Sequence, residues 1–227
     1  MAGIDSFTKL LLHFDGADAS VFFGDSATGK ALTTYGNAQI DTAQSKFGGA
    51  SGLFDGTGDL IDFPDTPDVD MAAGDFTVDF WIRTAQTTDG MLCGQSSNAG
   101  ADIAFYFRIN STANKMTFYI YDTAGRSVVS ATSINNGKWH HIAGVRYSNE
   151  MKLYINGVSE GTPVGSLGTI PDRTTRFAIG RMGEYDGVYF NGWIDEFRIS
   201  KGIARWTANF TPPTKAYSRD SDFFLFM

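Results

Sequence analysis

Adjacent carboxylates in Trp193-Ile194-Asp195-Glu196 are the nearest approach in this chain to an acid pair for glycoside cleavage. Retaining glycosidases need two carboxyl groups about 5–5.5 Å apart, one as nucleophile and one as acid. Neighbouring residues of a strand point to opposite faces, so Asp195 and Glu196 are not expected to meet one sugar. The chain also has no Gly-x-Ser-x-Gly elbow to accompany its three histidines. We therefore expect no catalytic activity, and a glycan-cleaving hydrolase is the enzymatic alternative.

Oxygen ligands for a divalent cation are concentrated between Lys46 and Arg83, where eight aspartates occur with no basic residue. Calcium takes about 6–8 oxygen ligands from carboxylates and carbonyls on loops, so the pattern predicts a Ca²⁺ site. We choose the aspartates that end a motif as its ligands: Asp15, Asp55, Asp59 and Asp195. The alternative is that these aspartates cap turns, because Asp readily bonds to its own backbone.

Aromatic side chains offer a second kind of site, because sugars stack on flat rings while neighbouring polar groups bond their hydroxyls. Alternation along the predicted strands places several such residues on outward faces. The candidate carbohydrate-binding residues are Trp81, Tyr106, Arg108, Tyr119, Tyr121 and His140. If their strands are neighbours, they form one concave surface. Alternatively, loops cover this sheet face and the aromatic side chains form a second core layer. The loops 98–102 and 181–189 are alternative binding sites, because binding loops cluster at the ends of a sandwich.

Strands are the elements that must position these residues. Phe76, Val78, Phe80 and Ile82 alternate with polar residues and Trp81, and 103–109, 116–121 and 139–146 repeat the pattern. Four Asp-Gly and three Asn-Gly dipeptides separate such stretches as tight turns. No stretch before Gly202 has helical periodicity. The chain is therefore predicted to be all-β, an antiparallel two-sheet sandwich of jelly-roll type.

The stretch after the Asn191-Gly192 turn predicts a long strand. Alternation places Trp193, Asp195, Phe197 and Ile199 on one face. A carboxylate among apolar residues needs several backbone hydrogen bonds or a cation. A turn or helical piece over 202–209 follows, with Ile203 and Trp206 available to pack under the sheet. The apolar tail 222–227 is expected to be a final strand, either inside the sandwich or covered by a partner.

Global properties bound the remaining choices. The 227 residues have 42% hydrophobic and 14% aromatic content, which suits one domain over 1–227. A net charge of −7 argues against nucleic acid as a ligand. No apolar run reaches the length of a membrane span, and no signal peptide is recognised at the start. Synthesis in a cytoplasm is therefore expected. The single cysteine, Cys93, is expected to be a buried, apolar side chain.

Four segments resemble one family in the expected order. Residues 192–214, Gly-Trp-Ile-Asp-Glu-Phe-Arg-Ile-Ser through Pro-Pro-Thr, resemble the closing segment of laminin-G-like, concanavalin A-like lectin/glucanase jelly rolls. Residues 9–16, 44–59 and 74–83 match earlier parts of such domains. The version that this chain resembles occurs in phage virion proteins and bacterial surface proteins. The family also includes glycosidases, and its members often bind Ca²⁺ at a sandwich rim.

The resemblance implies a non-catalytic phage virion protein, a tail, fibre or capsid decoration component that attaches to or decorates the particle. Its expected partners are other virion proteins and a host cell-surface glycan, with homo-oligomerisation suggested by the apolar tail. The expected location is the virion, after synthesis in the host cytoplasm, and a bacterial surface is the alternative. A purely structural decoration protein without a ligand remains a further alternative.

Overall fold

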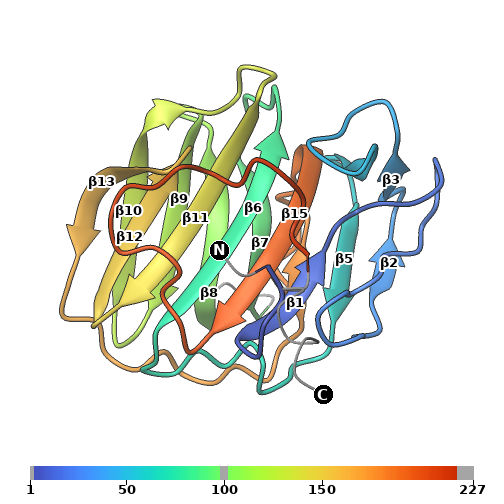
Figure 1. Cartoon of the computed structure of the whole chain (residues 1–227). Coiled ribbons are helices and arrows are strands. Elements are labelled where there is room, and N and C mark those ends of the chain that lie inside the picture. Colours follow the sequence, from blue (N-terminus) through green and yellow to red (C-terminus); the bar gives the residue numbers. More distant parts are fainter. Residues whose placement is uncertain (1–2, 98–101, 219–227) are drawn as a thin grey trace, which may run out of the picture.

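Fifteen strands, joined only in antiparallel ladders, make up the regular structure of the computed structural model, which describes residues 3–97 and 102–218 (Figure 1). The strands are β1 (Thr8–Leu12), β2 (Thr33–Tyr35), β3 (Gln39–Asp41), β4 (Ser51–Asp55), β5 (Leu60–Phe63), β6 (Phe76–Arg83), β7 (Gly90–Ser96), β8 (Ile103–Asn110), β9 (Lys115–Tyr121), β10 (Gly125–Ser133), β11 (Trp139–Tyr147), β12 (Glu150–Ile155), β13 (Val158–Val164), β14 (Phe177–Ile179) and β15 (Asn191–Lys201). No helix occurs in these residues, so none could cross a membrane. The prediction of an all-β antiparallel sandwich is confirmed.

Two sheets pack face to face. Sheet 1 has eight strands in the order β13-β12-β11-β6-β15-β4-β3, and β1 also pairs with β15. Sheet 2 has seven strands in the order β10-β9-β8-β7-β14-β5-β2. β15 is central to sheet 1, because β6 lies along one edge while β4 and β1 share the other. The last strand therefore joins the beginning and the middle of the chain.

Phenylalanine rings from both sheets fill the space between them. Phe80 of β6 stacks on Phe197 of β15 at 5.4 Å between ring centroids and meets Phe107 of β8 edge-on, also at 5.4 Å. The inward alternation predicted for β6, β8 and β9 is confirmed, and Cys93 is buried in the same core. Gly144 keeps the sheets close, since a Cβ there would lie 2.3 Å from the Phe107 ring.

A β-bulge in β15 makes the predicted facing of this strand wrong. Asp195 pairs with Trp81 and Arg198 with Asp79, so Glu196 and Phe197 together oppose the single residue Phe80. Glu196 takes the left-handed conformation this requires, with φ of 52°. Ile194, Phe197 and Ile199 all reach the core as a result. Without the extra residue, a strict two-residue period would turn part of this apolar set outward.

Residues 202–217, here called the strap, cross the outer face of sheet 1 without forming a helix, so the helical option for 202–209 is wrong (Figure 1). The expected packing of Trp206 is confirmed: it lies against Ala143, Val145 and Tyr154. Phe210 stacks on Trp206 with 4.1 Å between ring centroids. The strap thus turns one outer sheet face into a second core layer. The predicted strand 222–227 lies outside the described residues.

Candidate functional site

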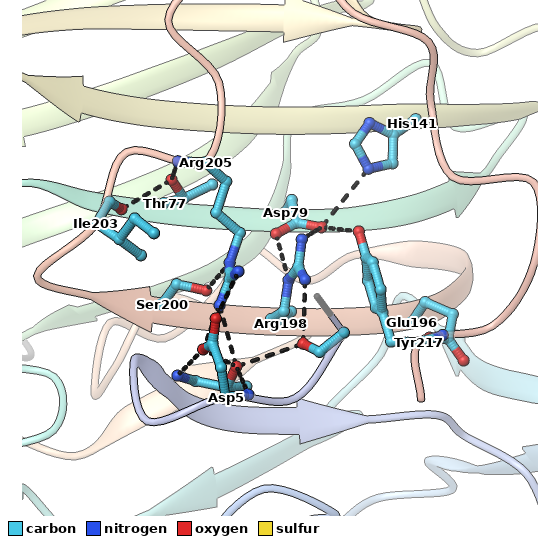
Figure 2. A network of polar contacts seen from close by, with 12 residues as sticks. Asp5, Thr77, Asp79, His141, Glu196, Arg198, Ser200, Ile203, Arg205 and Tyr217 are labelled. Atoms are coloured by element: carbon cyan, nitrogen blue, oxygen red, sulfur yellow. Dashed lines mark hydrogen bonds and ion pairs between the residues drawn. The ribbon is translucent and has the colours of Figure 1, made fainter. Parts of the chain in front are cut away.

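A buried polar network under the strap contains an aspartate, a histidine and two arginines, which are side-chain types that can do chemistry (Figure 2). Asp79 accepts hydrogen bonds from Arg198 Nε at 2.9 Å and Tyr217 Oη at 2.5 Å, and His141 Nε2 lies 3.6 Å away. Burial alone would raise the pKa of Asp79, but the charge of Arg198 and the contact with His141 outweigh it and lower the pKa to about 2.

This network fastens segments and offers no access to a substrate. Asp79, His141 and Arg198 have no exposed surface. Arg198 Nη1 also donates to the carbonyl of Gly3 at 3.2 Å, and Arg205 of the strap binds the Asp5 carboxylate. The ion pairs therefore tie the strap and the start of the chain to sheet 1.

The adjacent acids Asp195 and Glu196 are also buried, at 0% and 1% exposure. Asp195 Oδ2 accepts the amides of Lys46 and Phe47 at 2.7 and 3.0 Å, which confirms its expected backbone bonding. Glu196 bonds His13 Nδ1 at 2.6 Å, and this hydrogen bond raises the pKa of His13. Glu196 sits in the bulge and Asp195 directly before it, and both carboxylates are hydrogen-bonded within the fold.

Burial raises the pKa of Asp195 to about 7, although the two amide donors act in the opposite direction. The nearby charges of Glu196 and Asp15 raise it further. The second oxygen of Asp195, Oδ1, is buried without a hydrogen-bond partner among the described residues. The protonation of Asp195 therefore makes the stability of the fold depend on pH.

The four predicted calcium ligands do not form one site. Asp59 closes the β4–β5 turn by accepting the amides of Asn37 and Asp55, which is the alternative role of a turn cap. Asp195 instead binds the loop before β4, and Asp15 lies against Gly48 of that loop. These loops separate the aspartates into two regions because the chain must turn between β4 and β5.

Within residues 3–97 and 102–218, the group of three acids with oxygens close enough to share an ion is Asp65, Asp70 and Asp172, whose ligand atoms lie within 4.8 Å. Burial, with the charges of Asp172 and Asp65, raises the pKa of Asp70 to about 6. Calcium binding stays a prediction. A calcium-dependent fold would lose thermal stability in EDTA and recover it with added Ca²⁺, as measured by differential scanning fluorimetry. An unchanged midpoint in both conditions would remove the prediction.

The candidate aromatic residues are divided between the two sheets, so their strands are not all neighbours and the condition for one concave surface is not met. Tyr106, Arg108, Tyr119 and Tyr121 belong to β8 and β9 of sheet 2. Trp81 belongs to sheet 1, is 6% exposed and lies beneath Lys46 at 3.9 Å.

His140, also in sheet 1, alternates with His141 and shares the inward face of β11 with the core residue Ile142. Its ring contacts Asn136 and Asn156. The predicted outward position of His140 is therefore wrong, and His141 is the histidine on the outer face of β11.

The tyrosines of sheet 2 use part of their ring surface on each other. Tyr106 and Tyr119 stack at 4.6 Å between centroids with 6° between planes. Arg173 lies 5.7 Å from the centroid of Tyr121. One face of each stacked ring is thus covered, which leaves less flat area for a sugar. Glycan binding by Tyr106, Arg108, Tyr119 and Tyr121 stays a prediction.

A recess of about 740 Å³ opens at the end of the sandwich where β6 ends and β15 begins. It is here called the end recess and is formed by the β4–β5 turn, the β6–β7 loop and residues 187–193. Part of the 181–189 loop, the alternative binding loop, is in its wall. Tyr189 and Trp193 supply aromatic rings, and Asp55 and Asp89 supply carboxylates.

Gln86 holds the walls of the end recess together. Its side chain donates to the carbonyls of Asp89 and Tyr189 at 2.9 and 3.0 Å and accepts the Asn191 amide at 2.9 Å. One half-buried amide thus fixes two loops to the start of β15. A recess shaped in this way is largely preformed, which lowers the ordering cost of binding.

Trp193 also belongs to a row of side chains on the outer face of sheet 1. Trp139 of β11 pairs with Arg83 of β6, which pairs with Trp193 of β15. All three side chains are half-buried. We call them the Trp–Arg–Trp row. Our sequence reasoning missed Trp139 and Trp193 as site residues, because only the strand order β11-β6-β15 makes them neighbours of Arg83.

Two contacts set the row in place. Trp193 Nε1 donates to Asp41 Oδ2 at 2.6 Å, and the Arg83 guanidinium lies 5.8 Å from the Trp193 ring centroid. Arg83 Nη1 also donates to the side chain of Gln44. The last residue of β3 therefore holds Trp193, and the loop after β3 holds Arg83. The strap lies farther along the same face (Figure 1).

Comparison with protein families finds one matching model, described as the concanavalin A-like lectin/glucanases superfamily, over residues 55–205. No curated protein sequence matches the chain significantly. The family match covers both walls of the end recess and the whole Trp–Arg–Trp row.

Solved structures with a similar fold include toxin binding domains. The binding domain of Paraclostridial Mosquitocidal Protein 1 has a TM-score of 0.67 at 15% identity, covering 86% of this chain and 49% of that one. The receptor-binding domain of botulinum neurotoxin C/D mosaic serotype has a TM-score of 0.66 at 15% identity, covering 88% and 49%. The chain thus spans about half the length of these toxin domains.

A further neighbour is nearly the same size as this chain. Domain 4 of AbnA, a GH43 extracellular arabinanase from Geobacillus stearothermophilus, has a TM-score of 0.63 at 20% identity in a structure with arabinotriose. The alignment covers 87% of this chain and 93% of that domain. At these identities the likeness concerns the fold alone.

Proposed function

Because the chain belongs to the concanavalin A-like lectin/glucanase superfamily, we propose that it is a non-catalytic glycan-binding module whose ligand occupies the end recess. The observation that carries this proposal is the recess itself, where Tyr189 and Trp193 stand beside Asp55 and Asp89. Indole and phenol rings bind the apolar faces of sugars, and carboxylates accept hydrogen bonds from sugar hydroxyls. The toxin receptor-binding domains and the arabinotriose complex support a binding role for this fold.

The absence of catalysis is part of the proposal. The adjacent acids Asp195 and Glu196 are buried and bonded within the fold, so neither is placed to attack a glycosidic bond. In the recess, Asp55 caps the amide of Thr57 and Asp89 accepts the amide of Ser111. A reducing-sugar assay across a polysaccharide panel tests the hydrolase alternative, which gains support only if products accumulate.

We further propose that the module acts on a phage particle, as an attachment or decoration protein exposed to host glycans. This assignment rests on the resemblance of residues 192–214 to segments of virion proteins. A bacterial surface is the alternative location, and a ligand-free decoration protein is the alternative role. Particle cryo-electron microscopy tests the location, and failure to find this chain on any particle would count against it.

Trp193→Ala is expected to weaken glycan binding by about 5- to 150-fold, because it removes the ring shared by the end recess and the Trp–Arg–Trp row. A loss of roughly 1–3 kcal/mol, comparable to losing one aromatic stacking partner, predicts that size of effect. Glycan-array screening followed by isothermal titration calorimetry with the best ligand measures it.

Tyr147→Ala is the matched control, since Tyr147 is 43% exposed at the opposite end of β11 from Trp139. It should leave affinity unchanged. Thermal midpoints of both variants separate binding loss from unfolding. Equal affinities for the wild type and Trp193→Ala would contradict the placement of the ligand in the recess. No glycan binding by the folded wild-type protein would favour the purely structural role.

A further inference from the structure

Arg83 lies between two half-buried tryptophans without a carboxylate partner in the described parts of the chain. Five other arginines in the described residues have a carboxylate partner, among them Arg176 with Asp62, Arg198 with Asp79 and Arg205 with Asp5, whereas Arg108, Arg146 and Arg181 have no carboxylate within ion-pair distance. Among the described residues, Arg83 makes one hydrogen bond, in which its Nη1 donates to the neutral side chain of Gln44. Its remaining donors can therefore serve a group outside the fold.

Resting on the proposed glycan-binding function, we propose that the Trp–Arg–Trp row recognises an anionic unit of a linear glycan, a carboxylate or a sulfate. Arg83 donates hydrogen bonds to the anion, and the sugars on either side stack on Trp139 and Trp193. A guanidinium suits this task because its fork of donors matches the oxygens of a carboxylate or sulfate. The ligand class is thus an acidic oligosaccharide rather than a single terminal sugar.

Spacing across the strands supports an extended ligand. Neighbouring strands lie about 4.8 Å apart, so Trp139 and Trp193 are separated by two spacings, about 9.6 Å. That separation is close to the length of a disaccharide repeat. A glycan running across β11, β6 and β15 would place alternate units over the two indoles and the unit between them over Arg83. Since Trp193 also lines the end recess, the same chain can continue into it.

Charge fixes where the anion binds. The protein carries a net charge of −7, and Asp55 and Asp89 add negative charge inside the end recess. An anionic sugar is therefore disfavoured in the recess, where carboxylates accept bonds from neutral hydroxyls. Arg83 supplies the local positive charge. Because the contact is half-exposed, salt should weaken it, unlike the stacking on the indoles.

The test compares matched acidic and neutral oligosaccharides by isothermal titration calorimetry. The pairs are oligogalacturonate with its methyl ester and κ-carrageenan oligosaccharides with their desulfated form. The first pair probes a carboxylate and the second a sulfate. The wild type is expected to bind the acidic member of at least one pair tenfold or more tightly, and less tightly as NaCl is raised.

Arg83→Gln should abolish that preference while retaining binding of the neutral member, and Arg83→Lys should retain part of it. Trp139→Ala should weaken binding of both members, and Tyr147→Ala should change neither. An unchanged thermal midpoint for Arg83→Gln shows that the fold is intact.

Failure of this inference is distinguishable from failure of the proposed function. Equal affinity of the wild type for acidic and neutral members, with loss in Trp193→Ala, overturns the role of Arg83 and leaves the glycan-binding function standing. An acidic preference that survives in Arg83→Gln also overturns it. Binding of no oligosaccharide, neutral or acidic, overturns both proposals together.

Discussion

Replacing Asp79 with alanine is expected to destabilise the fold by about 3–5 kcal/mol, the cost of breaking a buried ion pair by removing one partner. The change takes from Arg198 the carboxylate that it contacts with two nitrogens, at 2.9 and 3.2 Å. It also removes the acceptor for Tyr217 Oη, which anchors the end of the strap. For a chain of 227 residues this corresponds to a fall in thermal midpoint of roughly 10 °C.

Urea unfolding followed by tryptophan fluorescence measures the change, and limited proteolysis shows whether the strap opens first. Glu150→Ala is the control, because Glu150 and Lys152 form an exposed ion pair at 3.0 Å in the same sheet. Exposed pairs contribute about 0–1 kcal/mol. If both variants lost the same small amount, the network of Figure 2 would not be what holds the strap on sheet 1.

Asp195→Asn is expected to remove a pH dependence from the free energy of unfolding. The raised pKa of Asp195, about 7 against an ordinary value of 3.8, corresponds to about 4 kcal/mol. Between these values the folded state holds a proton that the unfolded state has released. Stability from this group is therefore full below pH 4 and is lost as pH rises through 7. The asparagine cannot ionise, so its contribution does not change with pH.

The measurement is the free energy of unfolding of both proteins at pH 5 and pH 8. The free energy of unfolding of Asp195→Asn, relative to that of the wild type, should be higher at pH 8 than at pH 5. The Asp195 charge also acts to raise the pKa values of His13 and Lys46, so the difference between the two profiles contains this coupling as well as the titration of Asp195 itself. Parallel pH profiles for the two proteins would show that Asp195 titrates normally in the fold.

Local periodicity was sufficient to predict the sheet class and much of the core. Phe105 and Phe107 alternate with Tyr106 and Arg108 in the sequence, and the structure buries the first pair and leaves the second on the outer face. The backbone of a strand imposes this period of two on any sequence. The need of Asp195 for backbone donors also followed from chemistry alone, because a carboxylate among apolar neighbours must be bonded.

Wrong predictions arose where non-local contacts override that period. The bulge at Glu196 and Phe197 exists because the core accepts Ile194, Phe197 and Ile199 together, which no single-strand pattern expresses. The split of Trp81 from Tyr106 follows from strand order, since β6 and β8 pair within different sheets.

The amino-acid sequence by itself determined that this protein is an antiparallel sandwich, because alternation and turn residues act within a few positions of the chain. Only the tertiary structure decided the candidate site. Trp139, Arg83 and Trp193 are separated by more than fifty residues in each step, and hydrogen bonding between β11, β6 and β15 alone makes them neighbours. The strap decided which outer surface stays open, by covering one part of sheet 1 and leaving this row beside it.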